Sequence, residues 1–386
     1  MTPPFDVESE VRRRYRQGAS TTAAELCCPV DYDPRYLAAI PPEVLQRDYG
    51  CGDPSRHLRS GETVLDLGCG TGKICFIAAQ VVGPQGRVVG IDMTPEMLAV
   101  GRAAAPVVAQ RLGYANVDFR RGRIQDLALD LERLEAALAA SPVRDAEGWL
   151  AAESLAAELR RSEPLVADGS IDVVVSNCVL NLVRPELKGQ LFAEIHRVLR
   201  RGGRAVIADI VSDEPVPPHL QADPELWSGC VSGALTEEGF LAAFEAAGFY
   251  GIRLLERQRE PWRTVEGIEL RSVTVEAFRG KEGPCRERRQ AVVYLGPFKE
   301  VLDDDGHRLP RGVPAAVCDK TFHILTREPY RQHFAAVEPR VPVPPEEEAP
   351  FDCARTLRRQ PHETKGERYA HTSDGAASCC GPEGCC

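Results

Sequence analysis

The sequence predicts an α/β protein with a doubly wound parallel sheet, followed by a smaller α+β domain. From Thr63 onward, short apolar runs alternate with longer segments that are compatible with helices, and the first run ends in a glycine-rich loop. Buried parallel strands are continuous apolar runs, and helices connect them. The composition agrees, because 43% hydrophobic and 27% charged residues are ordinary for a globular protein. Collagen, coiled coils and wholly disordered chains are excluded.

The alternation assigns each element in turn. Valine, isoleucine and leucine dominate the predicted strands, and the segments between them are long enough for crossover helices. We expect strands at 63–67, 87–91, 117–119, 171–176 and 204–209, and helices at 74–82, 95–112 and 185–199. Leucines at helical spacing between the third and fourth strands predict a helical insertion over 128–169.

After about Pro215 the pattern no longer alternates. Here we expect a helix at 236–248, strands at 273–278, 291–295 and 318–325, and a turn at Asp303–Gly306. Residues 338–350 are rich in proline and glutamate, and the polar segment after them ends in Cys379, Cys380, Cys385 and Cys386. The predicted regions are an N-terminal cap (1–60), the α/β domain (61–215), a C-terminal α+β domain (216–337), and a linker with a disordered tail (338–386).

Charge and cysteine content restrict the partners and the compartment. The 47 basic and 57 acidic residues give a net charge of −10, which argues against a broadly basic nucleic-acid surface. The sequence contains no run of about 18 apolar residues, and its N-terminus lacks the apolar core of a signal peptide. We therefore predict a cytoplasmic protein without a membrane or nucleic-acid partner. Its 14 cysteines are then reduced thiols that act as ligands, nucleophiles or redox groups.

The loop after the first strand suits a nucleotide-like ligand. Gly68, Gly70 and Gly72 allow a tight turn and a close backbone approach, and Asp92 ends the next strand, where an acid can accept both ribose hydroxyls. A phosphate-binding P-loop does not fit, because Leu67 and Ile74 occupy positions that require glycine and Ser/Thr. A dinucleotide loop would have its third glycine one residue later, and a purely structural turn is the remaining alternative.

The pattern from Asp66 to Gly72 resembles the first motif of class I S-adenosylmethionine methyltransferases, which implies a Rossmann-like sheet. By this resemblance Asp66 positions the loop and the amino group of the cofactor, and the three glycines admit its methionine moiety. Asp92 holds the ribose, and Met93 packs on the adenine. Ile124 and Gln125 lie in a segment that resembles the later adenine-contacting motif, although an ordinary strand–loop junction is an alternative for it.

The end of the fourth strand carries a cysteine where amine methyltransferases place a polar motif. Taken alone, Cys178 would be a small buried apolar residue. However, several segments together resemble the arsenite methyltransferases: Asp48–Gly52 (DYGCG), Val64–Lys73 (VLDLGCGTGK), Gly90–Thr94 (GIDMT), Ser176–Leu182 (SNCVLNL) and Leu226–Leu235 (LWSGCVSGAL). The cysteine-rich ending is also similar to that family.

The resemblance implies a site for trivalent arsenic. Cys178 and Cys230 are its principal arsenic ligands, with Cys51 and an N-terminal cysteine, Cys28 in preference to Cys27, as a second pair that can form a disulfide. Tyr15 is expected to cover the cofactor, and Asn177 is expected to bind it. Trivalent arsenic is soft and prefers thiolate sulfur. Three thiolates leave its lone pair exposed to attack the sulfonium methyl group, and no general base is needed.

The prediction is therefore a monomeric arsenite methyltransferase that serves arsenic detoxification, with glutathione or thioredoxin returning the thiols. One alternative is a methyltransferase of another small nucleophile, and another is a thiol-rich protein that sequesters metalloids. Cys69 and Cys75 are expected to pack in the core. The four terminal cysteines gather arsenic or exchange thiols, bind zinc, or form a dispensable tail.

Overall fold

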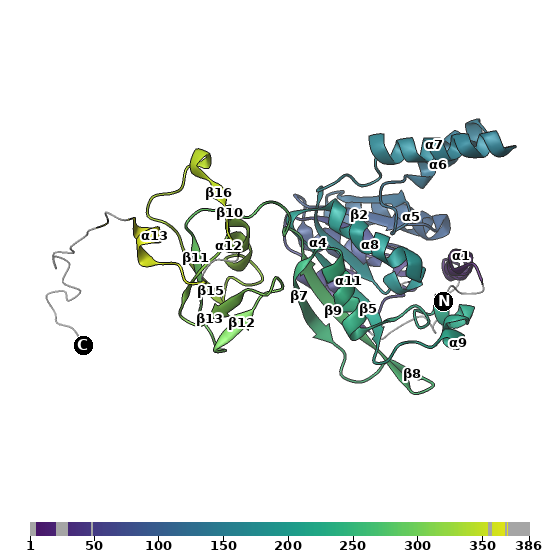
Figure 1. The fold of residues 1–386 in the computed structure, drawn as a ribbon. Coiled ribbons are helices and arrows are strands. Elements are labelled where there is room, and N and C mark those ends of the chain that lie inside the picture. The colour runs from purple at the N-terminus through teal and green to yellow at the C-terminus, as the bar shows by residue number, and fades with distance from the viewer. Residues whose placement is uncertain (1–4, 21–29, 48, 354–356, 367–368, 370–386) are drawn as a thin grey trace. The chain divides into compact units, whose positions relative to one another are not determined.

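The computed structural model describes residues 5–20, 30–47, 49–353, 357–366 and 369 (Figure 1). The chain divides into two compact units, Met1–Gly280 and Lys281–Cys386. The predicted boundary after residue 215 is therefore wrong. Strand β9 (Ile268–Phe278) pairs with β5 (Leu199–Ser212) from Arg204↔Phe278 to Ser212↔Leu270, which places it in the sheet of the first unit. In the described part of the chain, no helix is long and apolar enough to cross a membrane.

The first unit contains one large sheet with the order β3-β2-β1-β4-β5-β9-β7. The strands from β3 to β5 are parallel, whereas β9 runs antiparallel to both β5 and β7. The remaining bounds are β1 Thr63–Leu67, β2 Arg87–Asp92, β3 Val117–Arg121, β4 Ile171–Asn177 and β7 Tyr250–Arg257, with the short strands β6 Leu235–Thr236 and β8 Arg263–Val265. The predicted doubly wound parallel sheet is confirmed, with an antiparallel edge added.

Helices cover both faces of this sheet (Figure 1). Successive strand residues alternate between two apolar clusters: Leu65 packs with Phe192 and Phe244, whereas Val64 packs with Phe76 and its neighbours. The first face is covered by α8 (Pro185–Val198) and α11 (Glu237–Ala246), and the second by α4 (Lys73–Val82) and α5 (Pro95–Leu112). Burial on both faces explains why the strands are continuous apolar runs.

The predicted insertion is helical. It forms α6 (Leu131–Ala140) and α7 (Ala146–Ser162), which pack on each other. Arg160 on α7 forms an ion pair of 2.8 Å with Asp126, in the loop that follows β3. The remaining helices of the first unit are α1 Val7–Gly18, α2 Pro34–Leu37, α3 Pro42–Leu45, η2 Pro54–His57, η3 Leu180–Leu182, α9 Pro218–Gln221 and α10 Pro224–Ser228.

The second unit has its own small core. Its central strand β11 (Ala291–Tyr294) lies between β14 (Pro314–Ala316) and β15 (Phe334–Val337). The hairpin of β12 (Glu300–Leu302) and β13 (Arg308–Pro310) contains the predicted turn at Asp303–Gly306, closed by a 2.9 Å bond from Gly306 N to Asp303 O. The remaining elements are β10 Arg286–Glu287, β16 Ala349–Pro350, η4 Pro345–Glu347 and α13 Pro361–Lys365.

Two expectations for this unit are wrong. Residues 318–325 were expected to form a strand but contain helix α12 (Asp319–Leu325), because Cys318 caps it and Phe322 and Leu325 are buried at helical spacing. The segment after residue 338 was expected to be a linker and disordered tail. Instead β16 pairs with β10, and Arg359 is 2% exposed, with ion pairs to Glu287 and Glu363. The predicted tail cysteines from Cys379 onward lie outside the described residues.

Candidate active site

The glycine loop leaves β1 at the carboxyl edge of the parallel strands, where ligands bind in doubly wound sheets. Gly68, Gly70 and Gly72 all have positive φ angles, of 65°, 53° and 92°. A Cβ at Gly68 would lie 2.4 Å from a methyl carbon of Val179, whereas a Cβ at Gly70 would meet nothing within 4 Å. The loop therefore packs tightly on one side and stays open on the other, as a ligand cradle requires.

A pocket opens beside this loop. Asp92 at the end of β2 accepts bonds from Gly70 N (3.0 Å) and Thr94 N (2.8 Å), and burial raises the pKa of its carboxyl group. The predicted cofactor residues that line this pocket are Tyr15, Asp66, Gly68, Gly70, Asp92, Met93, Ile124, Gln125 and Asn177. Gly72 is not among them, since a Cβ there would lie 2.5 Å from Phe119 instead. An open loop, an acid and apolar side chains suit S-adenosylmethionine, so the residues present fit this cofactor.

Three predicted arsenic-site cysteines meet next to the pocket. Cys51, Cys178 and Cys230 are each 6% exposed and belong to one cluster with Trp227 and Tyr15. The thiol of Cys230 donates to Cys178 O over 3.1 Å. The neighbouring thiols of Cys230 and Cys51, together with burial, raise the pKa of Cys178 well above its usual range. Cys178 also lines the cofactor pocket, so the thiol cluster and the pocket adjoin at this residue.

The three thiols lie in one cluster, but their sulfur atoms are not all within 4.8 Å of one another. Among the described residues, a group of three potential ligands with every ligand atom within 4.8 Å occurs at Asp303, Asp305 and His307, not at these cysteines. Burial raises the pKa of Cys51 as well, so the thiols of Cys51 and Cys178 are protonated near neutral pH.

Two of these cysteines have a backbone conformation that side chains rarely adopt. Cys178 and Cys230 have φ angles of 64° and 63°, in the left-handed region. Such strain persists only where the surroundings enforce it, and it is concentrated at functional sites. Cys178 N donates to Ala208 O over 2.8 Å, which fixes its loop to the neighbouring strand β5.

A buried charged network links the two cysteine loops. Asp209, with no exposed surface, accepts bonds from Leu180 N (2.8 Å) and from the amide of Asn181 (2.9 Å). Burial raises the pKa of Asp209 to about 6. Lys188, whose pKa burial lowers to about 8, donates to Gly233 O. A Cβ at Gly233 would lie 2.0 Å from Asn181 O, so only glycine allows the loops to meet.

Asn177 holds a cysteine loop rather than standing free for the cofactor. Its Oδ1 accepts from Cys51 N (2.9 Å) and Gly52 N (3.0 Å), and its Nδ2 donates to Gly52 O (2.8 Å). Ser272 on β9 adds a 2.7 Å bond to Cys51 O. Thus Asn177 lines the pocket with its amide already engaged, and its geometry makes it a positioning residue for Cys51.

Helix α1 lies against this site. The hydroxyl of Tyr15 interacts with Cys230, and burial raises the pKa of Tyr15 well above its usual range. Arg14 on the same helix donates to Ser228 Oγ over 2.9 Å, and Glu8 pairs with Arg123 over 2.8 Å. Tyr15 therefore lines the pocket and also contacts the thiol of Cys230; its role as a cover of the cofactor stays a prediction. Cys27 and Cys28 lie outside the described residues.

The sequence analysis missed Asp209, Lys188 and Ser272. Asp209 had a signal, because it ends the apolar run predicted as a strand at 204–209, although β5 itself continues to Ser212. Lys188 and Ser272 had none, since one lies on an amphipathic helix and the other on a strand that was assigned to a different domain. Cys69 and Cys75 are buried, as expected for core residues, and burial raises the pKa of Cys69 to about 11.

Fold and site together define a class I S-adenosylmethionine methyltransferase. A family model described as "Methyltransferase domain" matches residues 58–140 and 155–248, and one described as "Domain of unknown function (DUF8838)" matches 281–369. An arsenite methyltransferase of Aquipseudomonas alcaligenes is 33% identical over 336 residues, covering 82% of this chain and 86% of that one. One of Mus musculus is 28% identical, covering 89% and 86%.

A solved structure agrees with these relatives. The crystal structure of an arsenic(III) S-adenosylmethionine methyltransferase from Chlamydomonas reinhardtii has a TM-score of 0.55 and 28% identity, and covers 84% of this chain and 100% of that one. The chain therefore belongs to the arsenite methyltransferase family, which confirms the predicted resemblance. The methyltransferase model leaves only residues 141–154 unmatched within 58–248, a shorter break than the predicted insertion over 128–169.

Proposed function

We propose that this protein methylates trivalent arsenic held by Cys51, Cys178 and Cys230, using S-adenosylmethionine. The observation that carries the proposal is the position of Cys178, which both lines the cofactor pocket and contacts the other two thiols. A nucleophile at this point lies directly beside the cofactor. The similarity to arsenite methyltransferases across 82% of the chain agrees with this assignment.

Protonated thiols suit the uptake of arsenic. Arsenous acid is neutral, and three thiols displace its hydroxyl groups as As(OH)₃ + 3 RSH → As(SR)₃ + 3 H₂O. No net proton is released, so the raised pKa values of Cys51 and Cys178 do not oppose binding. The products are three As–S bonds and an arsenic lone pair, and sulfur ligands match the softness of arsenic.

The protein's contribution to methyl transfer is positioning. S-adenosylmethionine supplies an electrophilic methyl group on its sulfonium. Asp92 and the loop at Gly70 would hold this cofactor, and Met93 and Ile124 would line its adenine. The left-handed loops at Cys178 and Cys230 direct their sulfurs, and the apolar surroundings of Trp227 exclude water. A near-attack geometry of this kind supplies much of the rate enhancement.

Transfer of a methyl cation to the lone pair converts As(III) to As(V), so two electrons must return before another turnover. Two thiols supply them by forming a disulfide, which an external thiol such as glutathione or thioredoxin then reduces. Arsenic detoxification is the physiological role that we infer. A monomer in the cytoplasm, acting on a small-molecule substrate, remains our expectation.

The test is product analysis after incubation with arsenite, S-adenosylmethionine and a thiol. We expect methylated arsenic and S-adenosylhomocysteine in matching amounts, and neither from Cys178→Ser. Methyl transfer to another acceptor that survives Cys178→Ser would support a methyltransferase of a different nucleophile. Arsenic binding without S-adenosylhomocysteine would support a sequestering protein instead.

A further inference from the structure

The described part of the second unit contains three cysteines that the proposed methyl transfer does not use. Cys285 precedes β10, Cys318 caps α12 and Cys353 follows β16. Although they are far apart in the sequence, all three line one cavity of about 490 Å³. Their exposure is graded, because Cys318 is buried, Cys285 is half-buried and Cys353 is exposed. Cys353 is therefore the most accessible of the three cysteines and Cys318 the least.

Backbone pairing explains the convergence. β10 and β16 pair in the register Arg286↔Pro350, and Phe351 N donates to Cys285 O over 2.9 Å. This pairing brings the segment of Cys353 beside Cys285. Cys318 lies next to Cys285: burial raises the pKa of the Cys318 thiol, and the adjacent thiol of Cys285 raises it further. Three separate segments of a small unit thus line one space with cysteines, although, as at the first cluster, their sulfur atoms are not all within 4.8 Å of one another.

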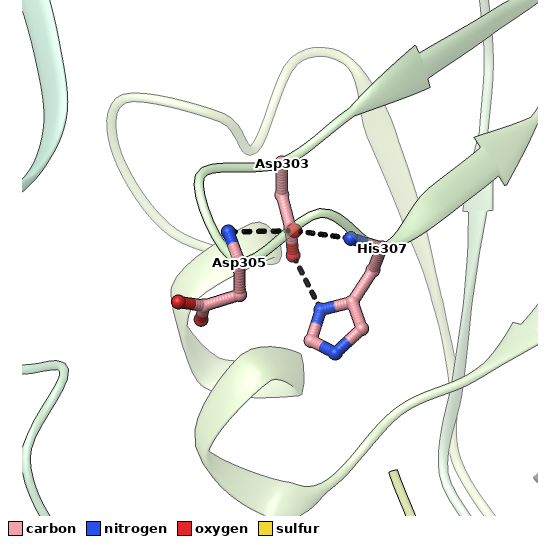
Figure 2. A group of neighbouring side chains, drawn as sticks. All are labelled: Asp303, Asp305 and His307. Carbon is pink, nitrogen blue, oxygen red and sulfur yellow. Dashed lines mark hydrogen bonds and ion pairs between the residues drawn. The ribbon is translucent and has the colours of Figure 1, made fainter. Parts of the chain in front are cut away.

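A histidine lines the same cavity. His307 Nδ1 lies 2.8 Å from Asp303 Oδ2, and Asp303 also accepts from the backbone N–H groups of Asp305 and His307 (Figure 2). A carboxylate only accepts, so Nδ1 of His307 donates this bond and Asp303 fixes the orientation of the ring. The two carboxylates do not make a cation site of their own, because Lys281 already pairs with Asp305 over 2.7 Å.

We propose that Cys285, Cys318 and Cys353 form a second thiol site, which binds trivalent arsenic outside the methyltransferase domain. Soft thiol ligands select soft ions, and arsenic is satisfied by three sulfurs in a pyramid with one open face. A structural zinc site would instead require a closed tetrahedron. Cys353 is exposed, which leaves space for the open face of such a pyramid. Binding follows the same exchange, in which three thiols and As(OH)₃ give As(SR)₃ and three waters.

The proposal rests on the proposed function only in the choice of arsenic as ligand. Its test is the alkylation rate of each cysteine in the reduced full-length chain, with and without arsenite, read by peptide mass spectrometry. With arsenite at about ten times its dissociation constant, Cys285, Cys318 and Cys353 should each react about tenfold more slowly. This protection should persist in a Cys178→Ser/Cys230→Ser variant, which removes the first thiol cluster.

Two further arms keep the test decisive. In Cys318→Ser, protection of Cys285 and Cys353 should fall while Cys178 and Cys230 remain protected; Cys285→Ser replaces this variant if it does not fold. Unchanged alkylation of the three cysteines while Cys178 and Cys230 are protected would overturn the second site. Protection by Zn²⁺ but not by arsenite would overturn it too. Loss of protection at Cys178 and Cys230 alone would instead contradict the proposed methyl transfer.

Discussion

The thiols of Cys51, Cys178 and Cys230 differ from those of the second unit in what surrounds them. The first three are almost fully buried, and two of them adopt left-handed backbone conformations beside a buried aspartate and lysine. The second three lie on short segments around an open cavity, and only Cys318 is buried. Buried charge and backbone strain cost stability. Both are present at the first cluster, where the proposed methyl transfer requires a directed lone pair, whereas the proposed capture of arsenic at the second requires only soft ligands.

The largest expected effect tests whether the first cluster is essential. Cys178→Ser and Cys230→Ser should each lower the rate of arsenite methylation by about a thousandfold or more, because a hydroxyl is a poor arsenic ligand and the near-attack geometry is lost. Rates are measured by S-adenosylhomocysteine release. Cofactor affinity, measured by calorimetry, should persist as the control. Full turnover by either variant would rule out arsenic held by these thiols.

The next effect concerns the stability of the second unit. Arg359 is 1% exposed at its side chain and pairs with Glu287 (2.8 Å) and Glu363 (3.0 Å). Arg359→Ala should destabilise this unit by about 2–3 kcal/mol, because it empties a buried position and removes the cation from the half-buried carboxylates of Glu287 and Glu363 and from Gln290 O. Hydrogen exchange of β11 measures the change. Its exposed neighbour provides the control variant, Arg358→Ala, which should change little. Equal exchange in both variants would show that this segment does not stabilise the unit.

The third prediction tests the energetic cost of the buried network. The pKa of Asp209 is about 6 in the folded protein and near 3.8 when unfolded, so the carboxyl group stays protonated to a higher pH in the native state. Its contribution to stability is therefore largest below pH 3.8 and declines as pH rises to 6, by on the order of 3 kcal/mol. Asp209→Asn removes this titration. Unfolding free energies of both proteins from pH 4 to 7 measure the difference.

The advantage of the wild type over Asp209→Asn should shrink between pH 4 and 6 and stay constant above. A difference that is independent of pH would show that Asp209 does not ionise in this range. At pH 7 the stability of the variant should differ least from that of the wild type. Its rate of arsenite methylation should nevertheless fall at this pH. That combination would distinguish positioning of the cysteine loops from a purely structural role.

The smallest effect separates the cofactor pocket from the thiols. Asp92→Ala should weaken S-adenosylmethionine binding by about 1.5–3 kcal/mol, the usual range for hydrogen bonds to a charged group. Arsenite protection of Cys178 from alkylation should remain unchanged without the cofactor. Calorimetry that finds equal affinity for both proteins would place the ribose elsewhere.

The sequence predicted the methyltransferase sheet well, since its strands are buried on both faces and read as unbroken apolar runs. The sequence analysis assigned β9 to the wrong domain. A single antiparallel strand late in the chain carries no local sign of which sheet it joins. Prediction also failed at 318–325, where a short apolar run suits strand or helix equally, and at Arg359, whose burial depends on Glu287 far along the chain. Partnerships of this kind are long-range and leave no periodicity.

For the site, the order of strand, glycine loop and Asp92 was enough to predict a nucleotide-like pocket, because the carboxyl ends of parallel strands meet at one edge. Asp66, Cys51, Cys178 and Cys230 were selected by the resemblance to methyltransferase families. Only the tertiary structure decided what Asn177 does, since its amide is taken by the loop of Cys51. The fold likewise decided that Asp209 and Lys188 support the cysteine loops, and that Cys285, Cys318 and Cys353 share a cavity. Local chemistry fixes which groups can react, whereas burial and contact depend on the whole fold.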